Sequence, residues 1–258
     1  MQMFETNNLE KQFFLEEGYL VKKNVLNKNT NFIEISKNFK IELEKLFDIK
    51  YLKHLGGFKS GNLNIYPGKF GEEILSILNN NSFKEYLNFL IDDNIEKYQI
   101  IFGGNLNLPK SKNQFFHTDG KWEPRMIIVN IATTNIKLLN GPLEIIEKTH
   151  LNKHSYWKFV LKIVFMSKKK LTLDFGDILI REHRLWHRGT TNFSENNREM
   201  LGIMFIKKQN NSEKLIDKNL YIKPNIFGDT FKERVKEYLF IYFKPILFLY
   251  KFFISIVK

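Results

Sequence analysis

The stretch Phe-Phe-His-Thr-Asp-Gly at residues 115–120 places an imidazole, His117, two positions before a carboxylate, Asp119. On a β-strand, side chains two positions apart point to the same face, so both groups can meet one ligand. Taken alone, this spacing more often marks a hydrogen-bonded structural pair than a metal site. The pattern around it and the residues further along the chain decide between these interpretations.

From about residue 97, short apolar and often β-branched segments alternate with turns, which is typical of strands. We expect strands at residues 100–108, 126–132, 143–146, 171–175, 178–181 and 200–206. The first third favours helices: Asn7 and Asn8 can cap a helix that ends before Gly18, and residues 83–91 repeat apolar side chains at helical spacing. The fold class predicted is mainly β with helical cover (α+β), an all-β barrel or jelly roll.

A second histidine, His187, follows His117 by seventy positions (187 − 117) in the stretch Leu-Trp-His-Arg-Gly at residues 185–189. Arg198 follows at the start of the next apolar segment. Two histidines and one carboxylate form the facial triad of non-haem Fe(II) oxygenases, which leaves three metal positions open. Because the chain has no cysteine, any metal must bind His, Asp or Glu. An arginine beyond the triad can clamp a carboxylate with two hydrogen bonds.

Four motifs carry a resemblance to a known family. They are Asn-Leu-Asn-Leu-Pro at 105–109, His-Thr-Asp-Gly at 117–120, Asn-Gly-Pro-Leu-Glu at 140–144 leading to Thr149-His150, and the stretch 176–198. The chain resembles the phytanoyl-CoA dioxygenase-like Fe(II)/2-oxoglutarate-dependent oxygenases over about residues 10–206. This resemblance implies a double-stranded β-helix, or cupin-type jelly roll, with its core at about residues 97–206.

The resemblance also implies roles for particular residues. His117, Asp119 and His187 would hold Fe(II), and Arg198 would pair with the distal carboxylate of the cosubstrate 2-oxoglutarate, with O2 as the other cosubstrate. Asn107, with Asn105 on the same strand face, would touch 2-oxoglutarate. Relatives that halogenate have lost the carboxylate that Asp119 supplies here, so hydroxylation or a related oxidation is favoured, with release of succinate and CO2.

Two features of the site depart from the family pattern or extend it. Many relatives carry Ser or Thr two residues after the distal histidine, where this chain has Gly189, and Thr190 or Thr191 would have to replace that contact. Aromatic and basic residues beside the ligands are candidates for the substrate pocket: Phe115, Trp122, Arg125 and Trp186. Other histidines have plainer interpretations, because His183 sits in a strand-like context that does not suit zinc, and His150 belongs to a loop with a solvent-facing polar role.

The C-terminal segment 238–258 is apolar and aromatic except for Lys244, Lys251 and Lys258, which recur every seven residues, close to two helical turns. We expect one hydrophobic helix with a lysine stripe extended by Ser255 and with Pro245 in its first turn. Such a helix suits an anionic membrane surface, or it packs on the barrel or on a partner subunit. The domains predicted are therefore 1–227, the oxygenase domain, and 228–258, the C-terminal segment.

Composition narrows the function classes. The net charge is +12, and residues 207–258 supply half of the excess, with eleven basic and five acidic side chains. The N-terminus lacks the pattern of a signal peptide, which predicts a cytoplasmic location, peripheral at the inner face of a membrane if residues 238–258 bind one. The function predicted is hydroxylation of a small-molecule, lipid or saccharide-type substrate. Alternatives are an oxidative demethylase of nucleic acid, suggested only by charge, and an inactive cupin-like binding module; no nucleic acid partner is expected.

Overall fold

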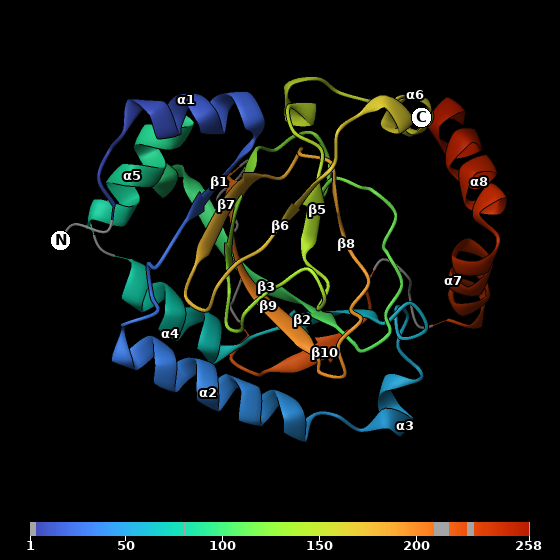
Figure 1. The fold of residues 1–258 in the computed structure, drawn as a ribbon, viewed down its shortest axis with the longest axis horizontal. Helices are drawn as coiled ribbons and strands as arrows, with labels where there is room; N and C mark the ends of the chain where they lie inside the picture. Colours follow the sequence, from blue (N-terminus) through green and yellow to red (C-terminus); the bar gives the residue numbers. More distant parts are fainter. Residues whose placement is uncertain (1–3, 80, 209–216, 226–229, 258) are drawn as a thin grey trace.

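The fold is seen in a computed structural model, which describes residues 4–79, 81–208, 217–225 and 230–257. Two antiparallel sheets face each other (Figure 1). The larger has the order β1-β7-β4-β9-β3-β2-β10, and the smaller has the order β6-β5-β8. The strands are β1 (Tyr19–Lys22), β2 (Asn62–Tyr66), β3 (Tyr98–Asn107), β4 (Met126–Ile131), β5 (Leu143–Ile145), β6 (Lys169–Leu171), β7 (Ile178–Glu182), β8 (His187–Gly189), β9 (Arg198–Lys207) and β10 (Tyr221–Lys223).

The two faces of the larger sheet differ in polarity: the outer face is apolar, and the inner face, which lines the space between the sheets, is more polar. In β9, Leu201, Ile203 and Phe205 join the main core, whereas Met200 and Met204 line the space between the sheets. The same alternation runs through the neighbouring strands β4 and β7, because successive side chains of a strand point to opposite faces. This alternation places the polar groups of the sheet around one interior space.

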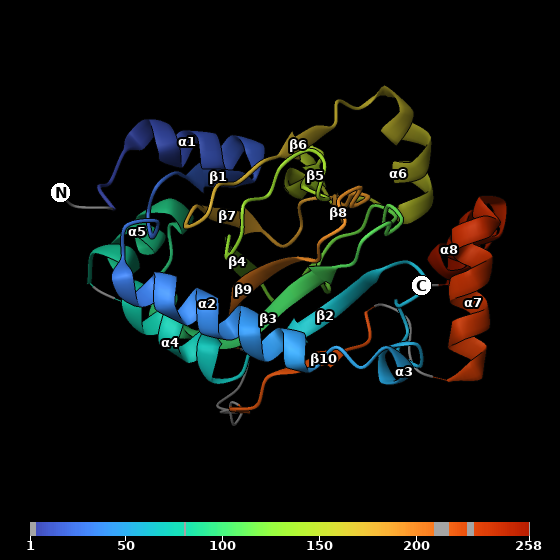
Figure 2. The ribbon, with the colours of Figure 1, turned by 60° about the horizontal axis from the view of Figure 1, so that its bottom comes forward.

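Helices cover the outer face of the larger sheet (Figure 2). The N-terminal helices are α1 (Asn8–Glu17), α2 (Thr30–Lys45), α3 (Ile49–Leu52), α4 (Lys69–Leu78) and α5 (Asn81–Ile91). As predicted, the Asn7 side chain caps α1 by accepting a hydrogen bond from the Leu9 amide, and α1 ends at Gly18, whose φ of 85° favours glycine. The predicted apolar face of α5 is buried in the main core.

One predicted strand is wrong in its bounds. Residues 171–175 do not form a strand, since β6 ends at Leu171 and only Leu173 makes a further bridge, to Ile136. The chain turns there because the buried Asp177 carboxylate accepts hydrogen bonds from the backbone amides of Asp174 and Asn24. The predicted fold class itself is confirmed: the chain is an antiparallel, sheet-rich α+β structure of the jelly-roll type.

The C-terminal segment differs from the single helix predicted for 238–258. It forms α7 (Phe231–Tyr242) and α8 (Lys244–Val257), which are separated at Phe243, and Pro245 lies in the first turn of α8 as predicted. Among the residues that the structure describes, no helix is both long enough and apolar enough to cross a membrane. The side chains of the predicted stripe, Lys244, Lys251, Ser255 and Lys258, lie outside the described part.

Both C-terminal helices are attached to the rest of the molecule. The buried carboxylate of Glu237 in α7 accepts hydrogen bonds from the backbone amides of Gly57 (2.9 Å) and Ser60 (3.0 Å). Helix α8 contacts α7 and also α6 (Tyr156–Lys162), which is followed by the short 3-10 helix η3 (Ile163–Phe165). Two more 3-10 helices are η1 (Ile95–Lys97) and η2 (Thr149–Leu151).

Candidate metal centre

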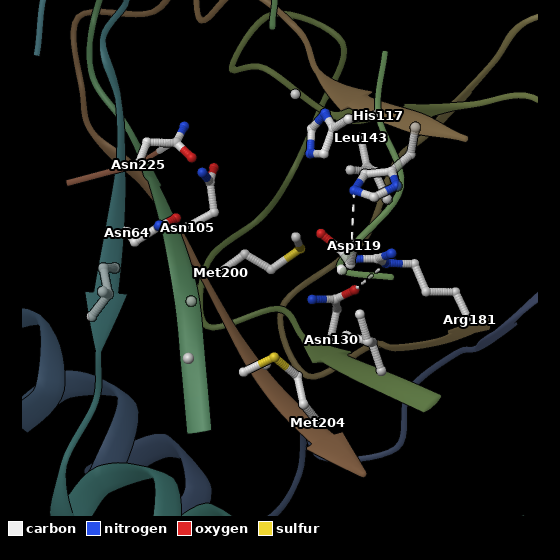
Figure 3. Close-up of a pocket in the computed structure, with 18 of the residues that line it drawn as sticks. Asn64, Asn105, His117, Asp119, Asn130, Leu143, Arg181, Met200, Met204 and Asn225 are labelled. Atoms are coloured by element: carbon white, nitrogen blue, oxygen red, sulfur yellow. Dashed lines mark hydrogen bonds and ion pairs between the residues drawn. The ribbon is translucent and has the colours of Figure 1, made fainter. Parts of the chain in front are cut away.

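Three predicted ligands come together in the space between the sheets, and Figure 3 shows two of them, His117 and Asp119. His117, Asp119 and His187 each offer one ligand atom, and these atoms all lie within 4.8 Å of one another. The backbones of His117 and His187 exchange two hydrogen bonds of 3.0 Å, and the Asp119 amide donates to the His183 carbonyl. Residues seventy positions apart are thus fixed side by side by main-chain pairing.

Both histidine rings are oriented by their own chain. The Nδ1 atoms of His117 and His187 lie 2.9 Å from the carbonyl oxygens of Phe115 and Leu185, respectively. Since a carbonyl only accepts, Nδ1 carries the proton and Nε2 keeps its lone pair for a metal. The Nε2 atom of His187 lies 3.4 Å from the Asp119 carboxylate.

Arg181 in β7 is a further site residue that sequence reasoning missed. Its guanidinium lies 2.6 Å from the Asp119 carboxylate and donates to the Asn130 side chain at 3.0 Å. Burial raises the pKa of Asp119, but the charge of Arg181 outweighs it and holds that pKa well below its usual range. Burial, reinforced by Arg181, lowers the pKa of His187 to about 3. At neutral pH the pair is therefore an anion and a neutral imidazole, the forms that bind a divalent cation.

Arg198, the first residue of β9, faces the same space. It is 2% exposed, and its Nη2 donates to the Gly141 carbonyl at 2.9 Å. Its Nε and Nη1 atoms are buried without a hydrogen-bond partner among the described residues. Burial lowers the pKa of Arg198 to about 10, so it stays charged at neutral pH. Two unused donors on a buried cation fit a carboxylate bound in two-pronged fashion, as 2-oxoglutarate would supply.

The two asparagines predicted to touch the cosubstrate differ in position. Asn107 pairs directly with Arg198 across the sheet and is fully buried, with its amide donating to the Thr190 carbonyl at 2.8 Å. It does not line the cavity, whereas Asn105 does. Asn107 therefore sits beside Arg198, and Asn105 lies further along the same strand face.

The predicted replacement of the missing hydroxyl at Gly189 is not what the structure shows. The Thr190 hydroxyl donates to the Pro142 carbonyl at 2.7 Å, the Thr191 hydroxyl bonds Asn113, and neither residue lines the cavity. Gln114 occupies the space instead, because its side-chain oxygen accepts a hydrogen bond from the Gly189 amide at 2.7 Å. A Cβ at Gly189 would lie 2.9 Å from that oxygen.

The triad, Arg181 and Arg198 line one cavity of about 510 Å³. Gly103 and Gly202 face each other across β3 and β9, so the sheet offers bare backbone to the cavity there. Across the cavity from His117 and Asp119, three asparagines form a second wall (Figure 3): Asn64 of β2, Asn105 of β3 and Asn225, which follows β10. Lys223 of β10 also lines the cavity.

The four residues expected around the substrate lie elsewhere. Trp186 stacks on Phe159, and Phe115 packs against Phe240 and Leu247, because side chains next to inward-pointing ligands turn outward. Trp122 and Arg125 border a separate cavity of about 220 Å³, where Arg125 pairs with Glu182.

Two other histidines have structural roles. His183 is buried, with its ring nitrogens near the carbonyls of Met126 and Lys121. His150 is also buried, which corrects its expected solvent-facing position: Nε2 lies 3.1 Å from the Leu15 carbonyl, and Gly18 leaves room for the ring.

Comparison with solved structures gives the fold independent support. The chain is similar to the non-haem α-ketoglutarate-dependent carbocyclase SnoK from nogalamycin biosynthesis (13% identity, TM-score 0.55, 86% of this chain and 88% of that one). It is similar to AviO1 from Streptomyces viridochromogenes Tue57 (14%, 0.60, 79% and 96%). It is also similar to EvdO2 from Micromonospora carbonacea var. aurantiaca, complexed with 2-oxoglutarate (13%, 0.57, 81% and 94%).

At the level of sequence, no curated protein matches this chain. The profile of the phytanoyl-CoA dioxygenase (PhyH) family matches residues 58–200, which is more than half of the chain and includes the whole triad and Arg198. The chain therefore belongs to the phytanoyl-CoA dioxygenase family of enzymes, dioxygenases that use Fe(II), 2-oxoglutarate and O2.

Proposed function

We propose that this protein is an Fe(II)- and 2-oxoglutarate-dependent hydroxylase of a small molecule, in which His117, Asp119 and His187 hold the metal. The observation that carries this proposal is Arg198, a buried cation with two unused donors in the same cavity as the triad. Burying a guanidinium without an ionic partner lowers the stability of the fold. We therefore infer that Arg198 binds an anion. The distal carboxylate of 2-oxoglutarate is that anion.

The protein's own side chains would bind and orient the iron and the cosubstrate. When bound, iron with 2-oxoglutarate supplies the activation of O2, and one oxygen atom each goes to succinate and to the substrate. Arg198 orients the cosubstrate, while Arg181 and the two carbonyl-bonded imidazoles hold the metal ligands in place.

The cavity walls favour a substrate with polar groups. The wall opposite the triad offers three asparagine amides and the Lys223 ammonium, which suit hydroxyl or acidic groups. One solved structure with a similar fold is that of the epimerase SnoN in complex with nogalamycin RO, a small molecule. We place this chain's substrate in the same broad class, which includes lipid and saccharide-type molecules.

We do not propose a nucleic acid substrate, because the cavity wall opposite the triad offers amides and a single lysine instead of aromatic side chains on which bases could stack. The intact triad and Arg198 argue against an inactive cupin-like binding module. A cytoplasmic location and an anionic membrane surface as a partner of residues 238–258 remain predictions.

The test is O2-dependent conversion of 2-oxoglutarate into succinate by the iron-loaded protein, with small hydroxylated and acidic molecules as candidate substrates. We expect slow conversion without substrate, faster conversion with a substrate, and none for His187→Ala. His54→Ala, at an exposed position, is the control and keeps full activity. No succinate from the iron-loaded, folded wild-type protein would contradict the proposal.

A further inference from the structure

Helix α6 with η3 has two faces of different character. On the inner face, Phe159 is fully buried and stacks on Trp186, with ring centroids 3.6 Å apart and planes at 17°. On the outer face, Leu161 is 60% exposed, Val164 73% and Phe165 90%. Exposed apolar side chains that are clustered on one face, unlike single ones, are typical of a contact surface.

The neighbouring helix α8 extends this apolar surface. Figures 1 and 2 place α6 beside α8, and the two helices are in contact. In α8, Ile246, Leu249 and Phe253 are 40%, 51% and 62% exposed, and their spacing of three and four residues puts them on one face. These residues with Leu161, Val164 and Phe165 are called the α6–α8 surface below.

Lysines are concentrated in the two sequence segments that carry the α6–α8 surface. Residues 151–170 contain six lysines and no acidic residue, and residues 244–258 contain three lysines and no acidic residue. Lys162, Lys168 and Lys170 are exposed, and none of them pairs with a carboxylate of the described residues. Apolar side chains set among unpaired lysines match a bilayer interface with anionic headgroups.

We propose that the α6–α8 surface docks this enzyme on an anionic lipid bilayer, with Leu161, Val164, Phe165 and the exposed face of α8 in the interface. Each of these side chains belongs to a helix surface that is exposed in the structure. A second copy of the chain is a poorer occupant, because it would bring lysines against lysines. The docking does not depend on the proposed reaction.

The docked helix is joined to the metal centre by side-chain packing. Phe159 of α6 stacks on Trp186, which directly precedes His187 in the sequence, and it also lies edge-on to Phe116, which precedes His117. The stack of Phe159 on Trp186 thus links α6 to β8, the strand that begins at His187.

The experiment is co-sedimentation of the full-length protein with vesicles of phosphatidylcholine alone or mixed with phosphatidylglycerol. We expect binding to the anionic vesicles that weakens with salt, and about tenfold weaker binding for Val164→Ser/Phe165→Ser. Lys162→Glu/Lys168→Glu is expected to remove the preference for phosphatidylglycerol. The matched control is Leu139→Ser/Phe193→Ser, an exposed aliphatic and aromatic pair (each 69% exposed) in other loops, with unchanged binding.

Three outcomes would overturn the proposal. One is failure of the wild-type protein to sediment with anionic vesicles; another is an equal loss in the control variant. The third is a concentration-dependent dimer, seen by analytical ultracentrifugation, that Phe165→Ser dissociates, which would assign the surface to a second copy. Absorption of the iron and 2-oxoglutarate complex, measured on the same variants, separates failure of docking from failure of the proposed function.

Discussion

The guanidinium of Arg181 lies 2.6 Å from the carboxylate of Asp119, and both side chains line the cavity that holds the triad. An arginine so close to a metal ligand neutralises the carboxylate while no cation is bound. It also fixes the direction in which the carboxylate points, since Asn130 holds the other side of the guanidinium. The metal centre is therefore preorganised by an ion pair within the protein.

Arg181→Met should lower the free energy of unfolding of the metal-free protein by about 2 kcal/mol, because it leaves Asp119 without its partner. A divalent cation takes over that neutralisation, so the loss should shrink when Fe(II), or Mn(II) as a redox-stable substitute, is present. Urea unfolding with and without metal measures both values. An equal loss in both states would show that Arg181 acts only in general packing.

The stability of the metal-free protein should depend on His187 below neutral pH. The pKa of His187 is about 3 in the folded state, against about 6.5 in the unfolded chain. As pH falls from 7 to 5, the unfolded chain takes up a proton that the folded protein does not, so stability is lost, by about 2 kcal/mol. His187→Asn should lose correspondingly less over the same range. Parallel pH profiles of wild type and variant would contradict this account.

Phe159 should be a strong stability determinant although it lies outside the cavity. It is fully buried against Trp186, and truncating a buried Phe leaves a void, so Phe159→Ala is expected to cost about 3 kcal/mol. Phe193→Ala, at a 69% exposed ring, should cost less than about 0.5 kcal/mol. Urea unfolding of both variants measures these losses. If Phe159→Ala and Phe193→Ala lowered the urea midpoint by similar amounts, α6 would not be anchored through this stack.

The sequence predicted most of the metal centre because its spacing is local or carried by motifs. His117 and Asp119 are two residues apart, and His187 and Arg198 stand in recognisable turns and strand starts, so their combination, together with the family resemblance, predicted them. Arg181 was missed, although one signal was visible: a charged residue that follows three apolar residues in a buried strand.

Other errors arose where packing between distant segments decides. Phe115 and Trp186 turn outward because the ligands beside them turn inward, and the helices that receive them, α6, α7 and α8, lie far along the chain. The hydroxyls of Thr190 and Thr191 are already bonded to other segments. Tertiary contacts of this kind leave no periodic pattern in the sequence.

The most direct test of the central claim is anaerobic titration of the protein with Fe(II) and 2-oxoglutarate, following the visible metal-to-ligand charge-transfer band. The wild-type protein should develop the band, His187→Ala should not, and Arg198→Met should need roughly 100-fold more 2-oxoglutarate, because a charge-assisted pair is lost. His54→Ala should match wild type. A folded wild-type protein without the band, or an Arg198→Met variant with unchanged affinity, would contradict the account.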